Sequence, residues 1–216
     1  MEKKIKWFDG TIDTVKAFPE EVAHQICRVL TVLQRGDPHL SVSKLGGKSG
    51  APGLSVVIHN DGKITRHVFV GGDTKDIYVL HARERPARRK AAPTADAVEL
   101  AKSRLAARGK ARTFGPGSCN AFGDVGIDLP DEFKGEAVIA NEIYKIIKRR
   151  KLNRIAAIKA MGCKAEFVDC ILSGGFTGYA LRWPLVYLSR LGFDADIVFR
   201  RTPRMRIGTI NVQTAS

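Results

Sequence analysis

The side chains best suited to chemistry in this 216-residue sequence are cations, and they gather in two runs. Residues 83–90 hold five Lys and Arg among eight positions, and residues 148–151 are four consecutive cations with Arg154 close behind. Cations at this density suit the phosphates of a nucleic-acid backbone, because each contact releases a condensed counterion. A solvated surface loop is the alternative interpretation of the first run. Both runs are therefore candidate nucleic-acid contacts.

The composition favours the same class of partner. The chain has 36 Lys and Arg against 22 Asp and Glu, a formal charge of +14, of which +8 falls in residues 1–110 and +6 in residues 111–216. Such a charge attracts nucleic acid, although a basic enzyme carries it too. Hydrophobic residues make up 44% of the chain, which excludes a wholly disordered or collagen-like protein.

The most specific motif follows the second basic run. Residues 152–174 predict two short helices with a turn at Gly162, and Asn153 is a suitable N-cap for the first helix. Val168 and Ile171 fall on the core side of the second helix, which leaves its outer side to Lys164, Ala165, Phe167 and Asp169. A helix-turn-helix presents its second helix to the major groove of DNA in this way. An ordinary helical hairpin is the alternative.

These features predict a DNA interface in two parts. The cations before the motif would position the phosphates, and the outer side of the second helix would approach the bases. The predicted DNA contacts are Lys148, Arg149, Arg150, Lys151, Arg154, Lys164, Ala165 and Phe167.

The elements that must position these side chains form an α+β pattern in the first half. A helix begins at Pro19 and stops at Gly36, and Asn60-Asp61-Gly62 is a strong hairpin signal between two apolar runs. The pattern predicts a small antiparallel sheet packed against helices. The predicted strands are residues 4–8, 54–59, 63–70 and 76–82, and residues 93–108 form a closing helix.

The second half is predicted to be mainly helical with a short β tail. Residues 136–150 place four isoleucines on one helical face, and Pro184 begins a later helix. Strand character returns at the end of the chain, in residues 196–201 and 205–212.

A glycine-rich stretch separates the two halves. Residues 109–129 lack helical or strand periodicity, which is typical of an interdomain linker, and its Phe114 and Phe122 could dock on a neighbouring surface. We therefore expect one domain at residues 1–108 and another at residues 130–216.

Cysteine use and hydropathy argue against several other classes. The four cysteines form no CxxC pair, so neither a zinc ribbon nor a thioredoxin motif is expected, and no metal or cofactor is predicted. No apolar window approaches the ~20 residues of a membrane span, and no signal-peptide core follows the basic start. We expect a cytoplasmic protein with no membrane partner.

Residues 130–212 resemble the antitoxins of the HigA type, which belong to the XRE/Cro-like helix-turn-helix regulators. The turn Met161-Gly162-Cys163, the hydrophobic helix faces and residues 185–198 carry the resemblance. Where the family has its polar base-reading residues, this chain has Asn153-Arg154 and Lys164-Ala165. The resemblance implies the fold and binding to operator DNA, but not which DNA sequence is read.

Residues 3–108 resemble the phage-derived HigB-like toxins of the RelE/ParE superfamily. The resemblance is spread over residues 44–46, Arg66, residues 79–82 and the basic segment before the closing helix. Toxin before antitoxin is the gene order of such pairs. The two resemblances together therefore imply a RelE-like toxin domain fused to its antitoxin on one chain.

Toxins of this superfamily cleave mRNA, often on the ribosome, through attack of a 2′-OH on the adjacent phosphate without a metal ion. The resemblance implies that His81 moves a proton and that Lys44, Arg66, Arg83 and Arg85 supply cations. Solvated sheet charges and a structural histidine are the alternative. Residues 83–86 read Arg-Glu-Arg-Pro where the family has an aromatic residue followed by paired lysines, which favours an inactive nuclease.

Three functions remain open. The first is an mRNA interferase-like toxin neutralised by a fused antitoxin-like domain, which binds operator DNA as a homodimer and represses its own transcription. The second is a DNA-binding regulator whose inactive toxin-like domain serves dimerisation or partner binding. The third is a phage-type nucleic-acid-binding accessory protein without catalysis. Growth arrest by residues 1–110 alone would separate the first function from the others.

Overall fold

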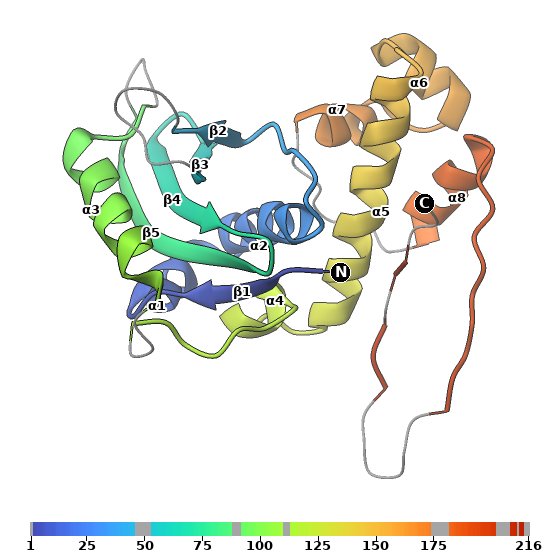
Figure 1. Ribbon diagram of the computed structural model, residues 1–216. Helices are drawn as coiled ribbons and strands as arrows, with labels where there is room; N and C mark the ends of the chain where they lie inside the picture. Colours follow the sequence, from blue (N-terminus) through green and yellow to red (C-terminus); the bar gives the residue numbers. More distant parts are fainter. Residues whose placement is uncertain are drawn as a thin grey trace. The chain divides into compact units, whose positions relative to one another are not determined.

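The computed structural model describes residues 2–45, 53–87, 92–109, 113–173, 182–201, 208–210 and 212–213. The chain divides into two compact units, an N-terminal unit, Met1–Asp128, and a C-terminal unit, Leu129–Ser216. Figure 1 shows the order of their helices and strands. Within the described ranges, no helix has both the length and the apolar character needed to cross a membrane.

The described part of the N-terminal unit contains a five-stranded sheet. Its strands are β1 (Lys4–Trp7), β2 (Val42–Lys44), β3 (Leu54–Asn60), β4 (Ile64–Gly72) and β5 (Asp76–Pro86), in the spatial order β1-β5-β4-β3-β2. Neighbours from β2 to β5 are antiparallel, whereas β1 runs parallel to β5. The prediction of a purely antiparallel sheet was therefore wrong. The residue alternation in β1 indicates a strand but carries no information about the direction of its partner.

The hairpin between β3 and β4 is confirmed, and its turn is stabilised by two side chains. Asn60 Oδ1 accepts a hydrogen bond from the Gly62 amide at 2.9 Å, and Asp61 Oδ1 accepts from the Lys63 and Ile64 amides at 2.9 and 2.7 Å. Gly62 has a φ of +87°, a conformation that glycine adopts without strain. The hydrogen bond from Ile64 is the largest cause of a lowered pKa at Asp61.

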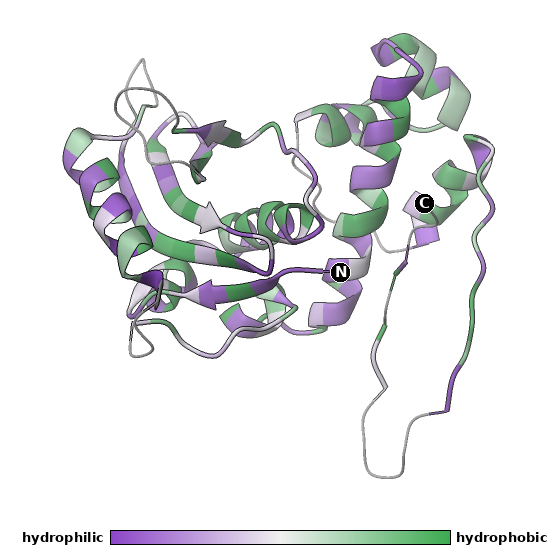
Figure 2. Ribbon diagram, in the orientation of Figure 1, coloured by the Kyte–Doolittle hydropathy of each residue, from purple (hydrophilic) through white to green (hydrophobic). Residues whose placement is uncertain are grey.

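Helices lie against both faces of this sheet, as Figure 1 shows for α1 (Thr11–Lys16), α2 (Glu20–Gln34) and α3 (Ala95–Ala106). The sequence predicted α2 and α3 but not α1 or the short strand β2. Figure 2 shows α2 as largely hydrophobic and α3 as mixed, in keeping with eleven buried residues in α2 and three in α3. Beneath α3, Gly71 allows close packing, because a Cβ there would lie 2.5 Å from Leu105 Cδ1.

The described part of the glycine-rich stretch belongs to the N-terminal unit, so its interpretation as a free linker was wrong for residues 113–128. The Ile5 amide donates to the Ser118 carbonyl at 2.7 Å, the Ser118 amide donates back at 3.0 Å, and Phe8 pairs with Phe114. The segment continues into α4 (Ala121–Val125), where Phe122 is fully buried. Burial of these aromatic rings outweighs the freedom of the glycines. The docking expected of Phe114 and Phe122 is confirmed.

The C-terminal unit is helical in its described residues, with α5 (Pro130–Arg149), α6 (Arg154–Met161), α7 (Ala165–Ser173) and α8 (Arg182–Arg190). α5 begins six residues earlier than predicted, with Pro130 at a favourable first position and two acidic residues in the first turn. Its apolar face forms the core with the other three helices. The fully or nearly fully buried members include Ile139, Ile143, Ile146, Ile147, Met161, Val168 and Ile171.

The predicted β tail is not observed in the described residues. Residues 196–201, 208–210 and 212 form no strand, while residues 205–207 and 211 of the prediction lie outside the described ranges. A strand needs a neighbour for its backbone hydrogen bonds, and residues 194–201 have none among the described residues. The apolar alternation of the tail indicated a tendency to pair, but it could not supply the partner.

Candidate nucleic-acid interface

The helices α6 and α7 and the turn between them have the form of a helix-turn-helix. As predicted, Asn153 caps α6, with its Oδ1 accepting from the Ala156 amide at 2.8 Å. Three residues then separate the end of α6 at Met161 from the start of α7 at Ala165. Two short helices with such a turn place the second helix where it can enter a DNA groove.

The turn is fixed by Gly162 and by an arginine from α8. Gly162 has a φ of +58°, and Arg190 Nη1 donates to the carbonyl oxygens of Met161 and Gly162 at 2.7 and 2.9 Å. A Cβ at Gly162 would lie 2.9 Å from that same nitrogen. The guanidinium thus satisfies carbonyl groups at the end of α6, which no intrahelical donor can reach. The contact joins α8 to the turn between α6 and α7.

Phe167 is part of the core and not of the DNA-facing surface. Its side chain is fully buried, and its ring centroid lies 4.4 Å from that of Tyr187. Residues four apart share a helical face, so Phe167 joins Ile171 in the buried stripe beside Val168. The prediction that Phe167 contacts DNA was wrong, because the buried face of α7 is wider than Val168 and Ile171 alone indicated.

The outer side of α7 carries more negative than positive charge. Lys164, Glu166 and Asp169 are exposed, and Ala165 is half-buried. Asp169 Oδ1 and Oδ2 accept from Arg154 Nε and Nη2 at 2.6 and 2.8 Å. This hydrogen-bonded pair lowers the pKa of Asp169 and raises that of Arg154. Arg154, expected to contact a phosphate, is therefore held by a carboxylate in this structure.

The predicted basic run lies at the end of α5 and is exposed throughout. Cations at this end of a helix are favoured by its partial negative charge. The guanidinium carbons of Arg149 and Arg150 lie 5.9 and 5.7 Å from the centroid of the Phe193 ring, and Lys148 Nζ lies 5.4 Å from that of Tyr144. Aromatic rings thus orient three of the four cations beside the start of the helix-turn-helix.

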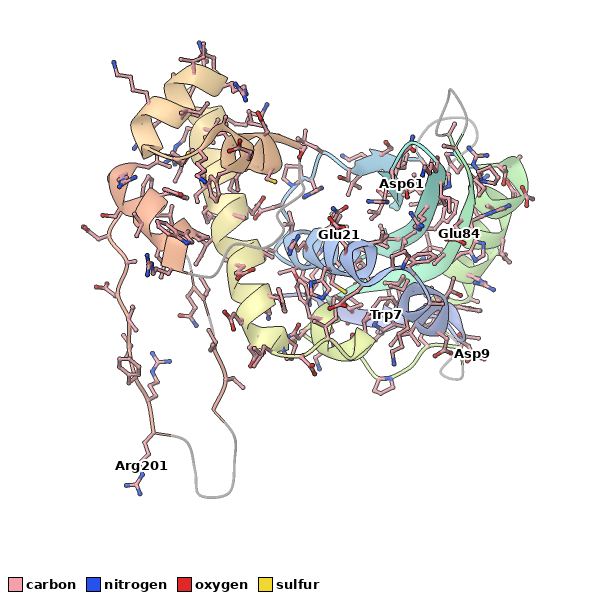
Figure 3. All side chains as sticks on the ribbon, turned by 180° about the vertical axis from the view of Figure 1, so that it is seen from behind. Trp7, Asp9, Glu21, Asp61, Glu84 and Arg201 are labelled. Atoms are coloured by element: carbon pink, nitrogen blue, oxygen red, sulfur yellow. The ribbon has the colours of Figure 1, made fainter. Side chains whose placement is uncertain are left out.

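In the N-terminal unit, Arg66 is buried and balanced by carboxylates. Its Nη1 lies 2.9 Å from Asp61 Oδ2, its Nε lies 3.3 Å from Glu84 Oε2, and its guanidinium carbon lies 5.8 Å from the centroid of the Phe18 ring. Figure 3 labels these two carboxylates. Only 4% of the Arg66 side chain is exposed, so it is not available to a phosphate. Lys44 is exposed in β2, opposite Ser55 in β3.

His81, Arg83 and Arg85 lie on the other face of the sheet, toward α3. The His81 ring stacks on Phe69 with centroids 5.8 Å apart. Arg83 Nη1 donates to Thr94 Oγ1 at 3.0 Å and lies 3.1 Å from Asp96 Oδ2. Arg85 donates to the Ala92 carbonyl. Arg66 lies opposite Glu84 in the register, so the two side chains share one face of the sheet. Successive residues of a strand point to opposite faces, so Arg83 and Arg85 lie on the other face. The five predicted catalytic residues therefore do not form one cluster.

The sequence analysis missed Arg104, whose guanidinium lies beside the His81 ring. Arg104 Nη1 is 3.5 Å from His81 Nδ1 and donates to the Leu80 carbonyl at 2.8 Å. That carbonyl is accessible because the register of β4 and β5 shifts between Phe69 and Val70, which leaves Leu80 as a bulge. Burial lowers the pKa of His81, and Arg104 and Arg83 lower it further. No local signal in the sequence marks this bulge.

No protein-family model matches the sequence, and no curated protein gives a significant match. Among solved structures, the chain is similar to a "Putative XRE Family Transcriptional Regulator" at 23% identity and a TM-score of 0.36. The match covers 40% of this chain and 97% of that protein. The helix-turn-helix assignment therefore depends on the geometry of α6, the turn and α7.

Proposed function

We propose that the C-terminal unit binds duplex DNA through α6 and α7 and that the protein regulates transcription. The observation that carries the proposal is the helix-turn-helix itself, with its N-cap at Asn153, its glycine turn and the clamp from Arg190. The C-terminal unit has 15 Lys and Arg against 8 Asp and Glu, a charge that suits a polyanionic partner.

The two parts of the interface would contact different parts of the DNA. The cations of residues 148–151 would bind phosphates, supply most of the affinity and set the orientation of α7. Lys164, Ala165 and Glu166, at the start of α7, would approach base edges, where a carboxylate can accept from the amino group of cytosine. Acidic side chains on α7 would at the same time weaken binding to DNA of unrelated sequence.

A selection experiment tests this proposal. The full chain is incubated with a random duplex library, and bound DNA is amplified and sequenced over several rounds. Enrichment of a defined sequence, lost when Lys164 and Glu166 are both changed to Ala, is the expected result. A homodimer would select two half-sites whose centres lie about 34 Å apart on one face of the duplex. Recovery of unenriched DNA would contradict sequence-specific binding.

A second candidate is the toxin–antitoxin fusion, with RNA cleavage by the N-terminal unit and repression by the C-terminal unit. The observation that favours it is the pairing of His81 with Arg104 on the half-buried face near Arg83. A histidine whose pKa is lowered stays neutral at pH 7 and can accept the proton of a 2′-OH, while the two guanidinium groups balance the phosphate. The substrate would be mRNA, and the ribosome that carries it would be a partner, as it is for the toxins.

Incubation of the full chain with mRNA, alone and on ribosomes, tests this second function. Cleavage that disappears in His81→Asn and in Arg104→Gln, but persists in Lys44→Ala, would support it. Intact mRNA under all conditions, together with normal growth when residues 1–128 are expressed in folded form, would leave the regulator as the function.

A further inference from the structure

The C-terminal unit exposes residues 194–201, here called the tail segment, whose centre is apolar and whose ends are charged. Figure 1 draws it as extended chain, and every residue in it is exposed. Ile197, Val198 and Phe199 are 70%, 68% and 93% exposed. Among the described residues, no backbone hydrogen bond reaches the tail segment. Within the described part of the chain, three adjacent residues of high strand propensity therefore have open backbone groups, which are a template for pairing with another strand.

The base of the tail segment is attached to the folded core. Phe193, which directly precedes it, packs on the core of the C-terminal unit and faces Arg149 and Arg150. Val212, near the end of the chain, packs on the same core. Because the tail segment is attached to the core through Phe193, a partner that pairs with it is tethered to that unit as well.

The charges of the tail segment are complementary to themselves. The centre of its sequence is Asp196-Ile-Val-Phe-Arg200, with an acid before three apolar residues and a base after them. In an antiparallel pair of two copies centred on Val198, Asp196 of each copy lies opposite Arg200 of the other, and Ile197 lies opposite Phe199. Opposite charges and aromatic–branched pairs directly across a ladder are both stabilising. A parallel pair would place like charges opposite each other.

We propose that the tail segments of two copies of this chain pair antiparallel about Val198 and join the copies as a two-fold dimer. A two-fold axis is the symmetry in which one surface can bind itself. A hairpin within one chain is a poorer partner, because residues 202–216 contain Arg204 and Arg206 and no Asp or Glu. The proposal is independent of DNA binding, which is measured separately.

Charge exchange in the full-length protein tests the pairing. The mass in solution is measured by light scattering over a range of concentrations. Asp196→Arg should raise the dimer dissociation constant at least about tenfold, since each copy then sets two cations opposite each other. The double variant D196R/R200D restores opposite charges at both positions and should restore the dimer. Asp194→Arg is the matched control, because Asp194 has no cation opposite it in this register, and its dimer should be unchanged.

Crosslinking tests the register. In a background that carries Cys119→Ser, because Cys119 is exposed, Val198→Cys should give a disulfide-linked dimer on mild oxidation. A residue on the two-fold axis faces its own copy at a Cβ separation of about 5 Å. Ala195→Cys, displaced from the axis, should give little crosslinked product.

Several results would overturn the proposal. These are a monomeric wild-type protein at 100 μM, a dimer that D196R leaves intact, and a D196R/R200D variant that stays monomeric. A further one is a dimer unaffected by D196R together with DNA binding weakened by Arg200→Gln, which would make the tail segment a DNA contact instead. Each variant's circular dichroism spectrum and DNA affinity are recorded alongside, so loss of folding or of DNA binding is distinguished from loss of pairing.

Discussion

The guanidinium of Arg154 and the carboxylate of Asp169 form a bidentate ion pair that joins the first turn of α6 to the middle of α7. Both side chains are about half exposed, so the pair contributes little to stability in water. The ion pair matters for DNA binding, because Arg154 is bound by a carboxylate of the same motif instead of a phosphate.

We predict that Asp169→Asn strengthens DNA binding. The change removes a negative charge from α7 and releases Arg154 for a phosphate, so the dissociation constant should fall about threefold to tenfold at 0.1 M salt. Fluorescence anisotropy with labelled duplex measures the change. On duplex of unrelated sequence, where Glu166 reads no base, Glu166→Gln removes the same charge without releasing an arginine and should have a smaller effect. Equal gains in the two variants would show that the pair does not withhold Arg154.

The basic run should set the salt dependence of DNA binding. Changing all four cations of residues 148–151 to Gln should weaken binding to every DNA sequence and reduce the slope of log K against log salt by about 3 to 4. Gln preserves helix propensity at the end of α5. The matched control changes Lys16 and Lys63 to Gln, two exposed cations of the N-terminal unit, and should leave the slope unchanged. A slope indifferent to the basic run would contradict its role.

Gly162→Ala should destabilise the C-terminal unit by about 1–3 kcal/mol, because alanine is strained at positive φ and its Cβ would displace the Arg190 guanidinium. Urea unfolding followed by circular dichroism measures the loss. Gly192→Ala is the control, since Gly192 has a φ of +80° with no atom near its would-be Cβ and incurs the backbone cost alone. If both variants lose the same stability, the clamp from Arg190 is unimportant.

Protonation of His81 should make the protein less stable in mild acid. The folded-state pKa of His81 lies below the ordinary value of 6.5, so the unfolded chain binds the proton more readily. The contribution of neutral His81 to the free energy of unfolding is fully present above about pH 6.5 and is lost as the pH falls through the folded-state pKa. His81→Gln should therefore show a shallower loss of unfolding free energy between pH 7.5 and pH 5. His24 and His59 have lowered pKa values as well, so part of the slope remains. Identical slopes in variant and wild type would contradict the prediction.

Local sequence was enough wherever the structure depends on neighbours in the chain. The hairpin at residues 60–62, the cap at Asn153 and the turn at Gly162 all use hydrogen bonds or backbone angles that span only a few residues. The apolar face of α5 is local as well, because helical periodicity alone brings its isoleucines together. These features account for the helix-turn-helix part of the candidate site.

The remaining features depend on contacts between distant segments, which no local pattern encodes. Arg66 is buried because β4 places it opposite Glu84, 18 residues away in sequence. Arg104 lies beside His81 because a bulge at Leu80 changes the register of β4 and β5. Residues 113–118 lie along β1 because the Phe114 ring packs against Phe8 and Tyr78. Tertiary packing therefore decided which predicted site residues are exposed.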